Sequence, residues 1–390
     1  MFTRRALERV VNIEDLRLLA KRRVPRSIFD YVDGGADGEV TLRDNRRAWD
    51  EVLFRPRNAT HIPNPDLRTS VLGCDLSMPM LLAPIGFSRL VNSQGELAVA
   101  QAAGDAGIGF MMSSFSGYRC EVVGAAAKAP LWYQLYLAGG RPAAEATLAR
   151  VWKAGFKALA VTIDTNCPGM RERDLRNGAP ALMGGNISHM LPYLPNILRH
   201  PGWLQQFLRD REAMFFPNIE IPNVGPLPAS DVRDVLKGAV VTWADMQWIR
   251  AAWPGPILAK GVITGDDARR ALDEGCAGVI VSNHGGRQLD TCYPALRALP
   301  EVVRAVNGAG TVLVDGGIRR GGDILKAIAM GASAVLIGRA YAYGLAAAGG
   351  AGVAKAIAIL QADLARTLIL LGCASVGELN ASYVDVPKHW

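Results

Sequence analysis

A histidine, two glycines and an arginine stand together in residues 282–290, which read Ser-Asn-His-Gly-Gly-Arg-Gln-Leu-Asp. The preceding residues, 278–281, form a β-branched apolar run that predicts a buried parallel strand. His284, just after that strand, is of the residue type best suited to take a proton at neutral pH. Arg287 is a fixed cation whose planar fork fits a carboxylate. On its own, a His-x-x-Arg pattern is more often part of an ordinary loop than of a functional site. The surrounding elements therefore determine which interpretation is favoured.

The elements that would position this string alternate regularly from Met80 onward. Eight short β-rich runs are separated mostly by Ala- and Leu-rich stretches of helical character, and several of these stretches end on glycine, as helices often do. Eight strands that alternate with helices predict a (β/α)8 TIM barrel. The expected strands are 80–83, 108–112, 131–136, 158–163, 256–260, 278–282, 311–315 and 334–338. An open doubly wound sheet is the alternative, but no Gly-x-Gly-x-x-Gly follows an early strand.

The length of 390 residues, with 50% hydrophobic and 20% charged residues, suits one large barrel or two domains. We expect a single domain, 1–390. It divides into an N-terminal helical segment (1–75), the barrel (76–345), a long loop insertion after the fourth strand (177–240) and C-terminal helices (346–390). In the first segment, Asn12 is expected to cap one helix, and Pro25 to open another that carries Tyr31 and ends near Gly34.

Composition excludes several classes of function. The net charge of +7 could suit nucleic acid, an anionic membrane or anionic substrates, but no basic run or nucleic-acid-binding motif accompanies it. Six cysteines without a Cys-x-x-Cys pair predict reduced thiols in a cytoplasmic protein, with no disulfide and no metal site. We expect no signal peptide, and no membrane span of about 18 uncharged apolar residues.

Candidate site residues, most of them polar or glycine, stand at or just after the carboxyl ends of the expected strands, where barrels place their active groups. In strand order these are Ala83, Pro84, Ile85 and Gly86; Ser113 and Ser114; Gln134 and Tyr136; Thr162 and Asp164; Lys260; Ser282 and His284; Asp315, Gly316 and Gly317; Gly338 and Arg339. Such residues at all eight ends favour a functional site over chance placement of groups that merely satisfy the core.

The last two strand ends predict an anion site. Gly316, Gly317 and Arg319 follow the seventh strand, and Gly338 and Arg339 follow the eighth. Backbone N–H groups of glycines, together with arginine side chains, form a cradle for phosphate, and barrels often hold phosphate at this place. We therefore expect a phosphorylated cofactor or substrate.

The remaining strand ends suggest redox chemistry on a carboxylic acid. Lys260 could neutralise negative charge that grows on a bound ring, and Ser113, Gln134 and Thr162 could bond to the edge of a heterocycle. Asp164 could fix the tautomer of His284 and stabilise its charged form. Arg171 and Arg287 together suggest a clamp for a carboxylate.

Eight strings, in this order, resemble those of one family. They are Phe29-Asp30-Tyr31 with Gly35-Ala36, Leu82 to Gly86, Gln134 to Tyr136, Thr162 to Asp164, Arg171 to Asp174, Ala259 to Gly261, residues 282–290, and Asp315 to Arg319. The resemblance is to the FMN-dependent α-hydroxy acid dehydrogenases and oxidases, which include flavin L-lactate dehydrogenase, (S)-mandelate dehydrogenase and glycolate oxidase. It extends over nearly the whole chain.

The resemblance implies FMN as the cofactor and oxidation of an (S)-2-hydroxy acid to a 2-oxo acid. It implies that His284 is the base, supported by Asp164, and that Arg171 and Arg287 bind the substrate carboxylate, while Tyr31 and Tyr136 contact substrate oxygens. The residues that it implies for FMN are Ala83, Pro84, Ile85, Ser113, Gln134, Thr162, Lys260, Ser282, Asp315, Gly316, Gly317, Arg319, Gly338 and Arg339. A homotetramer is likewise implied by the resemblance.

Two positions depart from the commonest family pattern. Ile85 stands where the family often has threonine, and Gly86 stands where many oxidases carry alanine. Gly86 favours a dehydrogenase that passes electrons to a quinone or another acceptor, with an oxidase that forms hydrogen peroxide as the alternative. An FMN-barrel isomerase, or a barrel without activity, should lack the set Tyr31, Arg171, His284 and Arg287.

Residues 187–216 of the insertion mix apolar and aromatic side chains with arginines. This segment could contact a membrane surface, cover the substrate or join subunits, and a self-packed rim of the barrel is an equal alternative. In membrane-associated members of the family this region meets the bilayer. The resemblance therefore implies a peripheral contact with the inner face of the cell membrane.

Overall fold

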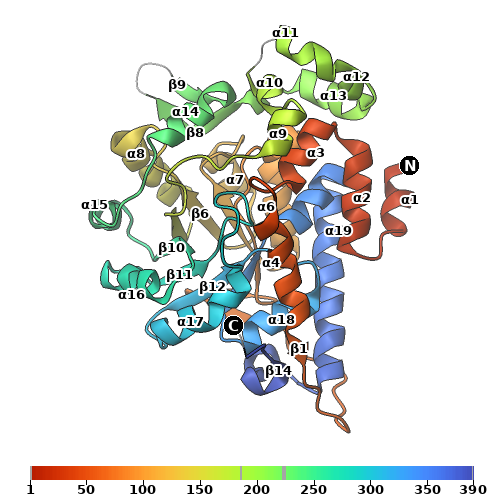
Figure 1. Ribbon diagram of the computed structural model, residues 1–390, viewed down its shortest axis with the longest axis vertical. Coiled ribbons are helices and arrows are strands. Elements are labelled where there is room, and N and C mark those ends of the chain that lie inside the picture. The colour runs from red at the N-terminus through yellow and green to blue at the C-terminus, as the bar shows by residue number, and fades with distance from the viewer. Residues whose placement is uncertain (1, 185–186, 222–224, 389) are drawn as a thin grey trace.

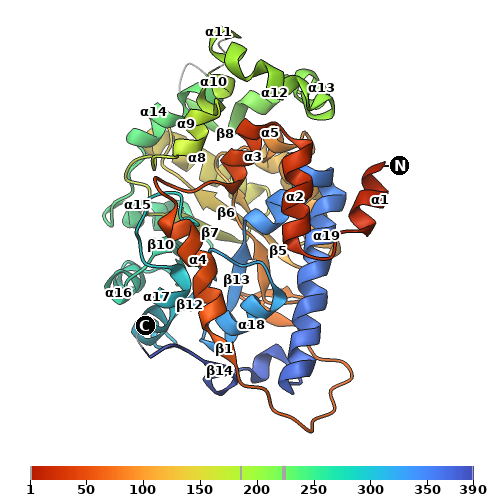
Figure 2. The same cartoon turned by 45° about the vertical axis from the view of Figure 1, so that its right-hand side comes forward.

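The computed structural model describes residues 2–184, 187–221, 225–388 and 390. Eight parallel strands close into a barrel in chain order, with β13 paired to β4, so the predicted TIM barrel is confirmed (Figures 1 and 2). Its strands are β4 (Met80–Leu82), β5 (Gly109–Ser113), β6 (Leu131–Leu135), β7 (Ala158–Thr162), β10 (Ile257–Val262), β11 (Gly278–Val281), β12 (Thr311–Asp315) and β13 (Ala334–Ile337). The bounds lie within about two residues of those expected.

Side chains that alternate along these strands face two separate cores. Leu81 of β4 and Met111 of β5 point into the barrel, where they meet Trp132 and the side chains of the other strands. Val71 and Leu76 join this inner cluster from the hairpin of β2 (Thr69–Val71) and β3 (Cys74–Leu76). The barrel is therefore filled by side chains and leaves its site to the loops at one end.

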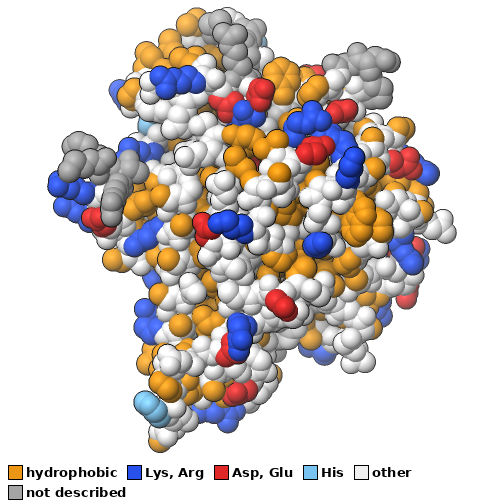
Figure 3. Space-filling view, turned by 180° about the vertical axis from the view of Figure 1, so that it is seen from behind, with side chains coloured by type: hydrophobic (Ala, Val, Ile, Leu, Met, Phe, Trp, Pro, Cys, Tyr) orange, Lys and Arg blue, Asp and Glu red, His pale blue; other side chains and the backbone are white. Residues whose placement is uncertain are grey.

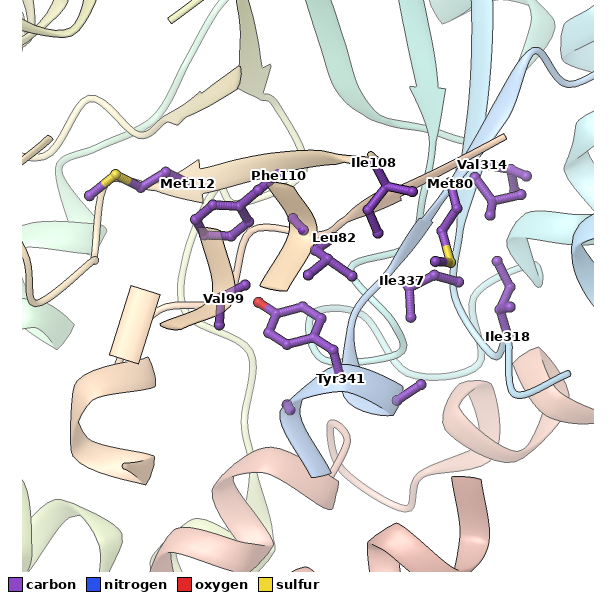
Figure 4. Packing of buried hydrophobic residues seen from close by; sticks show 14 of the residues in the cluster. Met80, Leu82, Val99, Ile108, Phe110, Met112, Val314, Ile318, Ile337 and Tyr341 are labelled. Atoms are coloured by element: carbon purple, nitrogen blue, oxygen red, sulfur yellow. The ribbon is translucent and has the colours of Figure 1, made fainter. Parts of the chain in front are cut away.

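The intervening side chains of the same strands pack outward against helices. Figure 4 shows Met80 and Leu82 with Phe110 and Tyr341 in this outer core. Tyr341 also donates a hydrogen bond to the carbonyl of Ala83, at 2.8 Å, and so joins a helix to the end of β4. The surrounding helices are α5 (Ser88–Val91), α6 (Gly95–Asp105), α7 (Cys120–Ala126), α8 (Gly140–Lys153), α15 (Asp245–Ala252), α16 (Gly265–Asp273), α17 (Ala295–Val306), α18 (Gly321–Ala329) and α19 (Arg339–Leu371).

Helix α19 is bent at Ala348 and Gly349, where the backbone leaves helical geometry. Among the described residues it is the one helix long and apolar enough to cross a membrane, but 61% of its most apolar window is buried. It packs against α2, α6 and α18, and lies along α2 in both ribbon views. This burial is that of a core helix.

The N-terminal segment consists of α1 (Phe2–Glu8), α2 (Ile13–Arg23), α3 (Arg26–Asp33) and α4 (Val40–Glu51). As predicted, Asn12 caps α2: its side chain accepts a hydrogen bond from the Asp15 amide, and Asp15 completes a capping box. Pro25 precedes α3, and Gly34 caps its carboxyl end. Two short strands, β1 (Leu53–Phe54) and β14 (Val384–Asp385), then pair the segment with the chain's other end.

The insertion after β7, expected as a loop, contains short helices and a hairpin. They are α9 (Glu172–Arg176), α10 (Ala179–Met183), α11 (Ile187–Met190), α12 (Leu194–Leu198), α13 (Pro201–Arg209), the strands β8 (Phe215–Ile221) and β9 (Gly225–Pro228), and α14 (Val232–Lys237). Figure 1 places them above the barrel. Trp203 and Phe216 of the insertion are buried. Trp203 stacks on Phe207 within the insertion, whereas Phe216 packs against Phe87 of the barrel, so the insertion packs partly on itself and partly on the barrel.

Candidate active site

One cavity at the carboxyl ends of the strands brings the expected site residues together. Its lining includes Tyr31, Ala83, Pro84, Ile85, Ser113, Gln134, Tyr136, Thr162, Arg171, Lys260, His284, Arg287, Asp315, Gly316, Gly317, Arg319, Gly338 and Arg339. The other two expected residues, Asp164 and Ser282, lie directly behind and bond to His284. No expected site residue is displaced to another part of the fold.

His284 follows β11 with a left-handed backbone, at φ +58°. Its Nδ1 atom lies 3.1 Å from Asp164 Oδ1, and its Nε2 atom lies 3.1 Å from the hydroxyl of Tyr136. Burial acts to raise the pKa of Asp164, but His284 and Lys260 outweigh it and hold this pKa below its usual value. Asp164 is therefore ionised, favours a proton on Nδ1 and leaves Nε2 as the ring's acceptor.

Two arginines and a tyrosine form the carboxylate side of the cavity. The Arg287 guanidinium lies 5.0 Å from the centre of the Tyr31 ring, and that of Arg171 lies 5.9 Å from it. Arg171 pairs with Asp174 at 2.8 Å. Among the described residues, Arg287 forms no ion pair: it bonds to the carbonyls of Tyr31 and Gly34 at 2.7 and 3.0 Å. Its charge is left for an anion from outside the chain.

Burial lowers the pKa of Arg287, and the neighbouring Arg171 lowers it further. Burial likewise raises the pKa of Tyr31 and of Tyr136. The arginine remains a cation at neutral pH because its ordinary pKa is so high, while both phenols stay protonated. The cavity therefore combines a positive clamp with two hydroxyl donors.

A chain of hydrogen bonds crosses the floor of the cavity. Ser113 donates to Gln134 at 3.0 Å, and Gln134 donates to Thr162 at 2.8 Å. Beside them, Lys260 is 4% exposed and lies 2.9 Å both from Ser282 Oγ and from Asp315 Oδ2. A buried cation next to neutral hydrogen-bonding groups suits the edge of a polar ring that becomes more negative during reaction.

The loops after β12 and β13 form the anion cradle. Gly316 and Gly317 adopt positive φ angles of 93° and 81°, and a Cβ on Gly317 would overlap the backbone oxygen of Asn45, so glycine is required there. Arg339 donates to three backbone carbonyls at 2.7 to 3.1 Å. Burial, together with Arg287, lowers its pKa to about 10. Arg319, in the loop after β12, lines the same cavity.

Comparison with known proteins identifies this arrangement. The FMN-dependent dehydrogenase family matches residues 20–386. The chain belongs to the FMN-dependent α-hydroxy acid dehydrogenase/oxidase family. Membership confirms the resemblance and FMN as the cofactor, and makes the protein an FMN-dependent 2-hydroxy acid oxidoreductase.

Individual members of the family differ in what receives the electrons. An L-lactate oxidase of Nostoc sp. is 39% identical over 388 residues, which cover 98% of this chain and all of that one. A putative L-lactate dehydrogenase of Mycobacterium tuberculosis is 39% identical over 98% of this chain and 91% of its own. A crystal structure of the monotopic membrane protein (S)-mandelate dehydrogenase superposes with a TM-score of 0.86 at 34% identity, over 97% of this chain and all of that one.

The residues present fit FMN. Asp315 Oδ1 is buried and, among the described residues, has no hydrogen-bond partner, so it can accept from a ribityl hydroxyl. Arg319, Arg339 and the glycine loops can hold the phosphate. The bonded chain of Ser113, Gln134 and Thr162, with Lys260, can hold the ring edge.

The sequence analysis did not predict the hydrogen bonds by which helix α4 supports two loops of the site. Asn45 of α4 and Asn283 exchange two side-chain hydrogen bonds, at 2.8 and 2.9 Å, and Trp49 of α4 donates to the Gly316 carbonyl at 2.8 Å. Helix α4 thus braces both the His284 loop and the phosphate loop. Nothing local in the sequence marks Asn45, because its partner lies 238 residues away.

A second omission is the wall of the cavity contributed by the insertion. Val232 and Leu236 of α14 line it, as does Pro168. Val232, Val235 and Leu236 have the i, i+3, i+4 spacing of an amphipathic helix. That signal could have located α14, although not its contact with the site.

Proposed function

We propose that this protein oxidises an (S)-2-hydroxy acid of the L-lactate or (S)-mandelate type to the 2-oxo acid. The electrons then pass to a quinone or another acceptor. The observation that carries the proposal is that two groups line one cavity. They are the Nε2 atom of His284, which meets the Tyr136 hydroxyl at 3.1 Å, and the Arg287 guanidinium, which forms no ion pair with the described residues. A base and a carboxylate clamp that line one cavity select an acid with a removable proton.

In this proposal the clamp orients the substrate. Arg171 and Arg287 bind the carboxylate, Arg287 through its fork. The hydroxyl of Tyr31 donates to the Gly86 carbonyl at 3.2 Å in the structure, and that of Tyr136 meets His284 Nε2 at 3.1 Å. With substrate bound, both hydroxyls turn to donate to its carboxylate or hydroxyl oxygens, since burial keeps both phenols protonated. These contacts fix the α-carbon opposite His284. The loss of entropy on aligning the substrate for reaction therefore occurs when the substrate binds.

His284 then accepts the proton on Nε2. That proton is the hydroxyl proton if hydride is transferred and the α-proton if a carbanion forms, and the base acts in the same position in both routes. The ionised Asp164 stabilises the imidazolium through Nδ1. FMN, when bound, supplies a two-electron sink. Lys260, buried beside Ser282, would stabilise the negative charge that the cofactor gains near the strand ends when it accepts electrons.

Gly86 supports an acceptor other than oxygen. A Cβ on this residue would lie 2.9 Å from Phe115 Cβ and 3.8 Å from the Tyr31 hydroxyl, so the glycine keeps a narrow space open between side chains of the substrate cavity. Many oxidases of the family carry alanine at this position. Oxygen as acceptor is the second candidate, favoured by the 39% identity to an L-lactate oxidase over the whole chain.

The surface of the insertion supports a peripheral membrane contact. Leu191, Leu194, Leu198 and Leu208 are 39 to 65% exposed, and we call these four residues the leucine surface. Hydrophobic side chains gather on this lobe, at the upper left of Figure 3. The similar (S)-mandelate dehydrogenase is described as monotopic. We infer a protein on the inner face of the cell membrane that assembles, by family resemblance, as a homotetramer.

The reaction is tested by anaerobic spectroscopy with L-lactate and (S)-mandelate, followed by admission of air. Bleaching of the yellow flavin band by either acid is expected, and no bleaching by any 2-hydroxy acid would refute the proposal. Slow reoxidation in air that a quinone analogue accelerates supports the dehydrogenase. Prompt reoxidation with formation of hydrogen peroxide would establish the oxidase instead.

A further inference from the structure

Arg89 of α5 joins three parts of the chain that are distant in the sequence. Its Nε and Nη2 atoms each lie 2.7 Å from an oxygen of Asp210, which caps the carboxyl end of α13 in the insertion. Its Nη1 atom donates to the carbonyl of Gly117, in the loop after β5, at 2.9 Å. The side chains of Arg89 and Asp210 are 11% and 12% exposed. A forked pair that is shielded from water fixes its two elements more firmly than an exposed pair does.

The backbone of Gly117 is held from two directions. Arg89 binds its carbonyl, and the buried carboxyl group of Glu96 in α6 accepts a hydrogen bond from its N–H at 3.2 Å. A Cβ on Gly117 would lie 2.8 Å from the Cβ of Arg89, so a side chain at this position would displace the arginine. The Arg89 guanidinium also lies 4.3 Å from the centre of the Tyr118 ring. Arg89 is therefore a main determinant of where the loop after β5 lies.

The two barrel segments that Arg89 joins carry aromatic rings that pack against Tyr31 and Tyr136, which we call the substrate tyrosines. Phe87, two residues before Arg89, packs edge-on against Tyr31 with ring centres 5.4 Å apart. Phe115, in the loop after β5, lies 5.1 Å from the ring of Tyr136. The amide of Phe87 also donates to the Phe115 carbonyl at 3.0 Å. The relative position of the two segments therefore bears on both substrate tyrosines.

The two segments approach each other most closely at Gly86, where a Cβ would lie 2.9 Å from that of Phe115. The Tyr31 hydroxyl donates to the Gly86 carbonyl at 3.2 Å. A shift of one segment against the other would therefore move the surroundings of the substrate tyrosines. Among the described residues, those that line the active-site cavity do not include Arg89. Its effect on the reaction must act through these neighbours.

We propose that Arg89 is a positioning residue for the substrate tyrosines. By binding Asp210 and Gly117 together, it holds the segments after β4 and β5 at the separation that places Tyr31 and Tyr136 for contact with substrate oxygens. This inference rests on the proposed function, in which both phenols contact the substrate. It adds a residue outside the cavity to the binding of the acid, and it gives the insertion a part in the geometry of the site.

The test is the anaerobic steady-state kinetics of Arg89→Ala with L-lactate and (S)-mandelate, with dichlorophenolindophenol as acceptor. Loss of contacts made equally in the ground state and the transition state raises KM and leaves kcat nearly unchanged. We expect KM for the acid to rise roughly tenfold, as when a hydrogen bond to a charged group is lost. Titration with the 2-oxo acid product, followed by flavin absorbance, should show the same rise in Kd. The FMN content and the KM for the acceptor should match the wild type.

Arg89→Lys separates position from charge. Lysine keeps the positive charge but cannot bind Asp210 through two nitrogens and Gly117 through a third in the fixed geometry of a guanidinium. The KM for the acid should therefore rise in this variant as well. A wild-type KM in Arg89→Lys would mean that the charge alone matters, and would overturn the positioning role. Asp210→Asn should also raise KM, and should add little when combined with Arg89→Ala, because both changes break the same pair.

A double-mutant cycle tests whether the effect acts through a substrate tyrosine. Tyr136→Phe removes a hydroxyl that contacts the substrate and should raise the Kd for the 2-oxo acid. In the Arg89→Ala background this rise should be smaller, because the hydroxyl is already misplaced. Equal rises in both backgrounds would show that Arg89 supports the fold alone.

Arg297→Ala is the matched control. The Arg297 side chain is 15% exposed and binds both carboxylate oxygens of Glu51, at 2.8 and 3.0 Å. Neither residue is among the described lining of the active-site cavity. The variant should lose stability as Arg89→Ala does, yet keep the wild-type KM. An equal rise of KM in Arg297→Ala would show that the effect follows from lost stability, and would overturn the inference.

The outcomes separate this inference from the proposed function. If no 2-hydroxy acid reduces the flavin of the wild-type protein, the proposed function fails, and this inference fails with it. If the wild type is reduced and Arg89→Ala keeps the wild-type KM and Kd, the inference alone is wrong. If Arg89→Ala does not fold, Arg89→Lys and Asp210→Asn decide in its place, since both keep a side chain of similar length.

Discussion

The Nδ1 atom of His284 lies 3.1 Å from the Oδ1 atom of Asp164. The carboxylate comes from the end of β7 and the histidine from the loop after β11, which are separated in the barrel by β10. Because His284 and Lys260 hold the pKa of Asp164 low against the effect of burial, the pair consists of a fixed anion and a ring that can take a proton. This relationship gives the first prediction.

His284→Ala should retain bound FMN and lose reduction by substrate. Apart from Ser282, the residues expected to hold FMN lie on other strand ends, so the yellow absorbance and the FMN content should match the wild type. The rate of anaerobic flavin reduction should fall roughly 10²–10⁴-fold, the usual contribution of a general base. Stopped-flow absorbance measures it, and normal turnover in this variant would remove His284 from the role of base.

Arg287→Lys should weaken substrate use without loss of charge. Lysine cannot offer the two parallel hydrogen bonds of a guanidinium, and a hydrogen bond to a charged group contributes about 1.5–3 kcal/mol. We expect kcat/KM to fall roughly 10- to 100-fold. Arg304→Lys, an exposed change on α17, is the control, and an unchanged kcat/KM in Arg287→Lys would place the clamp elsewhere.

Glu96 should make stability depend on pH. It is 1% exposed, one of its oxygens has no partner among the described residues, and burial raises its pKa to about 7. A carboxyl group whose folded pKa exceeds the unfolded one stabilises the fold while protonated. That stability is therefore lost as pH rises from about 4.5 to about 7.

Glu96→Gln mimics the protonated state and should remove this decline, which could reach about 3 kcal/mol in the free energy of unfolding. Urea unfolding at several pH values measures it. Glu121→Gln should show the opposite sign, since a hydrogen bond from Arg150 lowers the pKa of Glu121 to about 2, so that variant loses stability at neutral pH. Parallel pH curves for Glu96→Gln and wild type would contradict the assignment.

Asn45→Ala should affect both stability and catalysis. The change leaves Asn283 without its reciprocal partner, and a buried polar group left unsatisfied costs about 1–3 kcal/mol. The His284 loop would lose one of its braces, so flavin reduction should also slow. Asn58→Ala, at an exposed position, is the control, and a loss of stability with an unchanged reduction rate would show that Asn45 supports the fold alone.

The sequence predicted the barrel and its site because both signals are local. Each strand is a short apolar run, and the residues that line the cavity lie near its carboxyl end or in the loop after it, as Lys260 in β10 and His284 after β11 do. The structure of the insertion was harder to predict from the sequence. Its elements are short and depend on contacts with distant residues, such as that of Phe216 with Phe87. The Asn45–Asn283 pair was hidden for the same reason.

The leucine surface gives the last prediction. Leu198 and Leu208 are 57% and 65% exposed, and burial of a leucine side chain contributes about 1.5–3 kcal/mol. Arg199 and Arg209 lie on the same segment, and each could add about 1 kcal/mol near anionic headgroups. The wild type should therefore sediment with vesicles that contain phosphatidylglycerol, and less so at high salt. The double variant Leu198→Asp/Leu208→Asp should remain in the supernatant with unchanged flavin reduction. Leu370→Asp, 67% exposed at the end of α19, should sediment like the wild type; if all three proteins behave alike, the leucine surface does not contact the membrane.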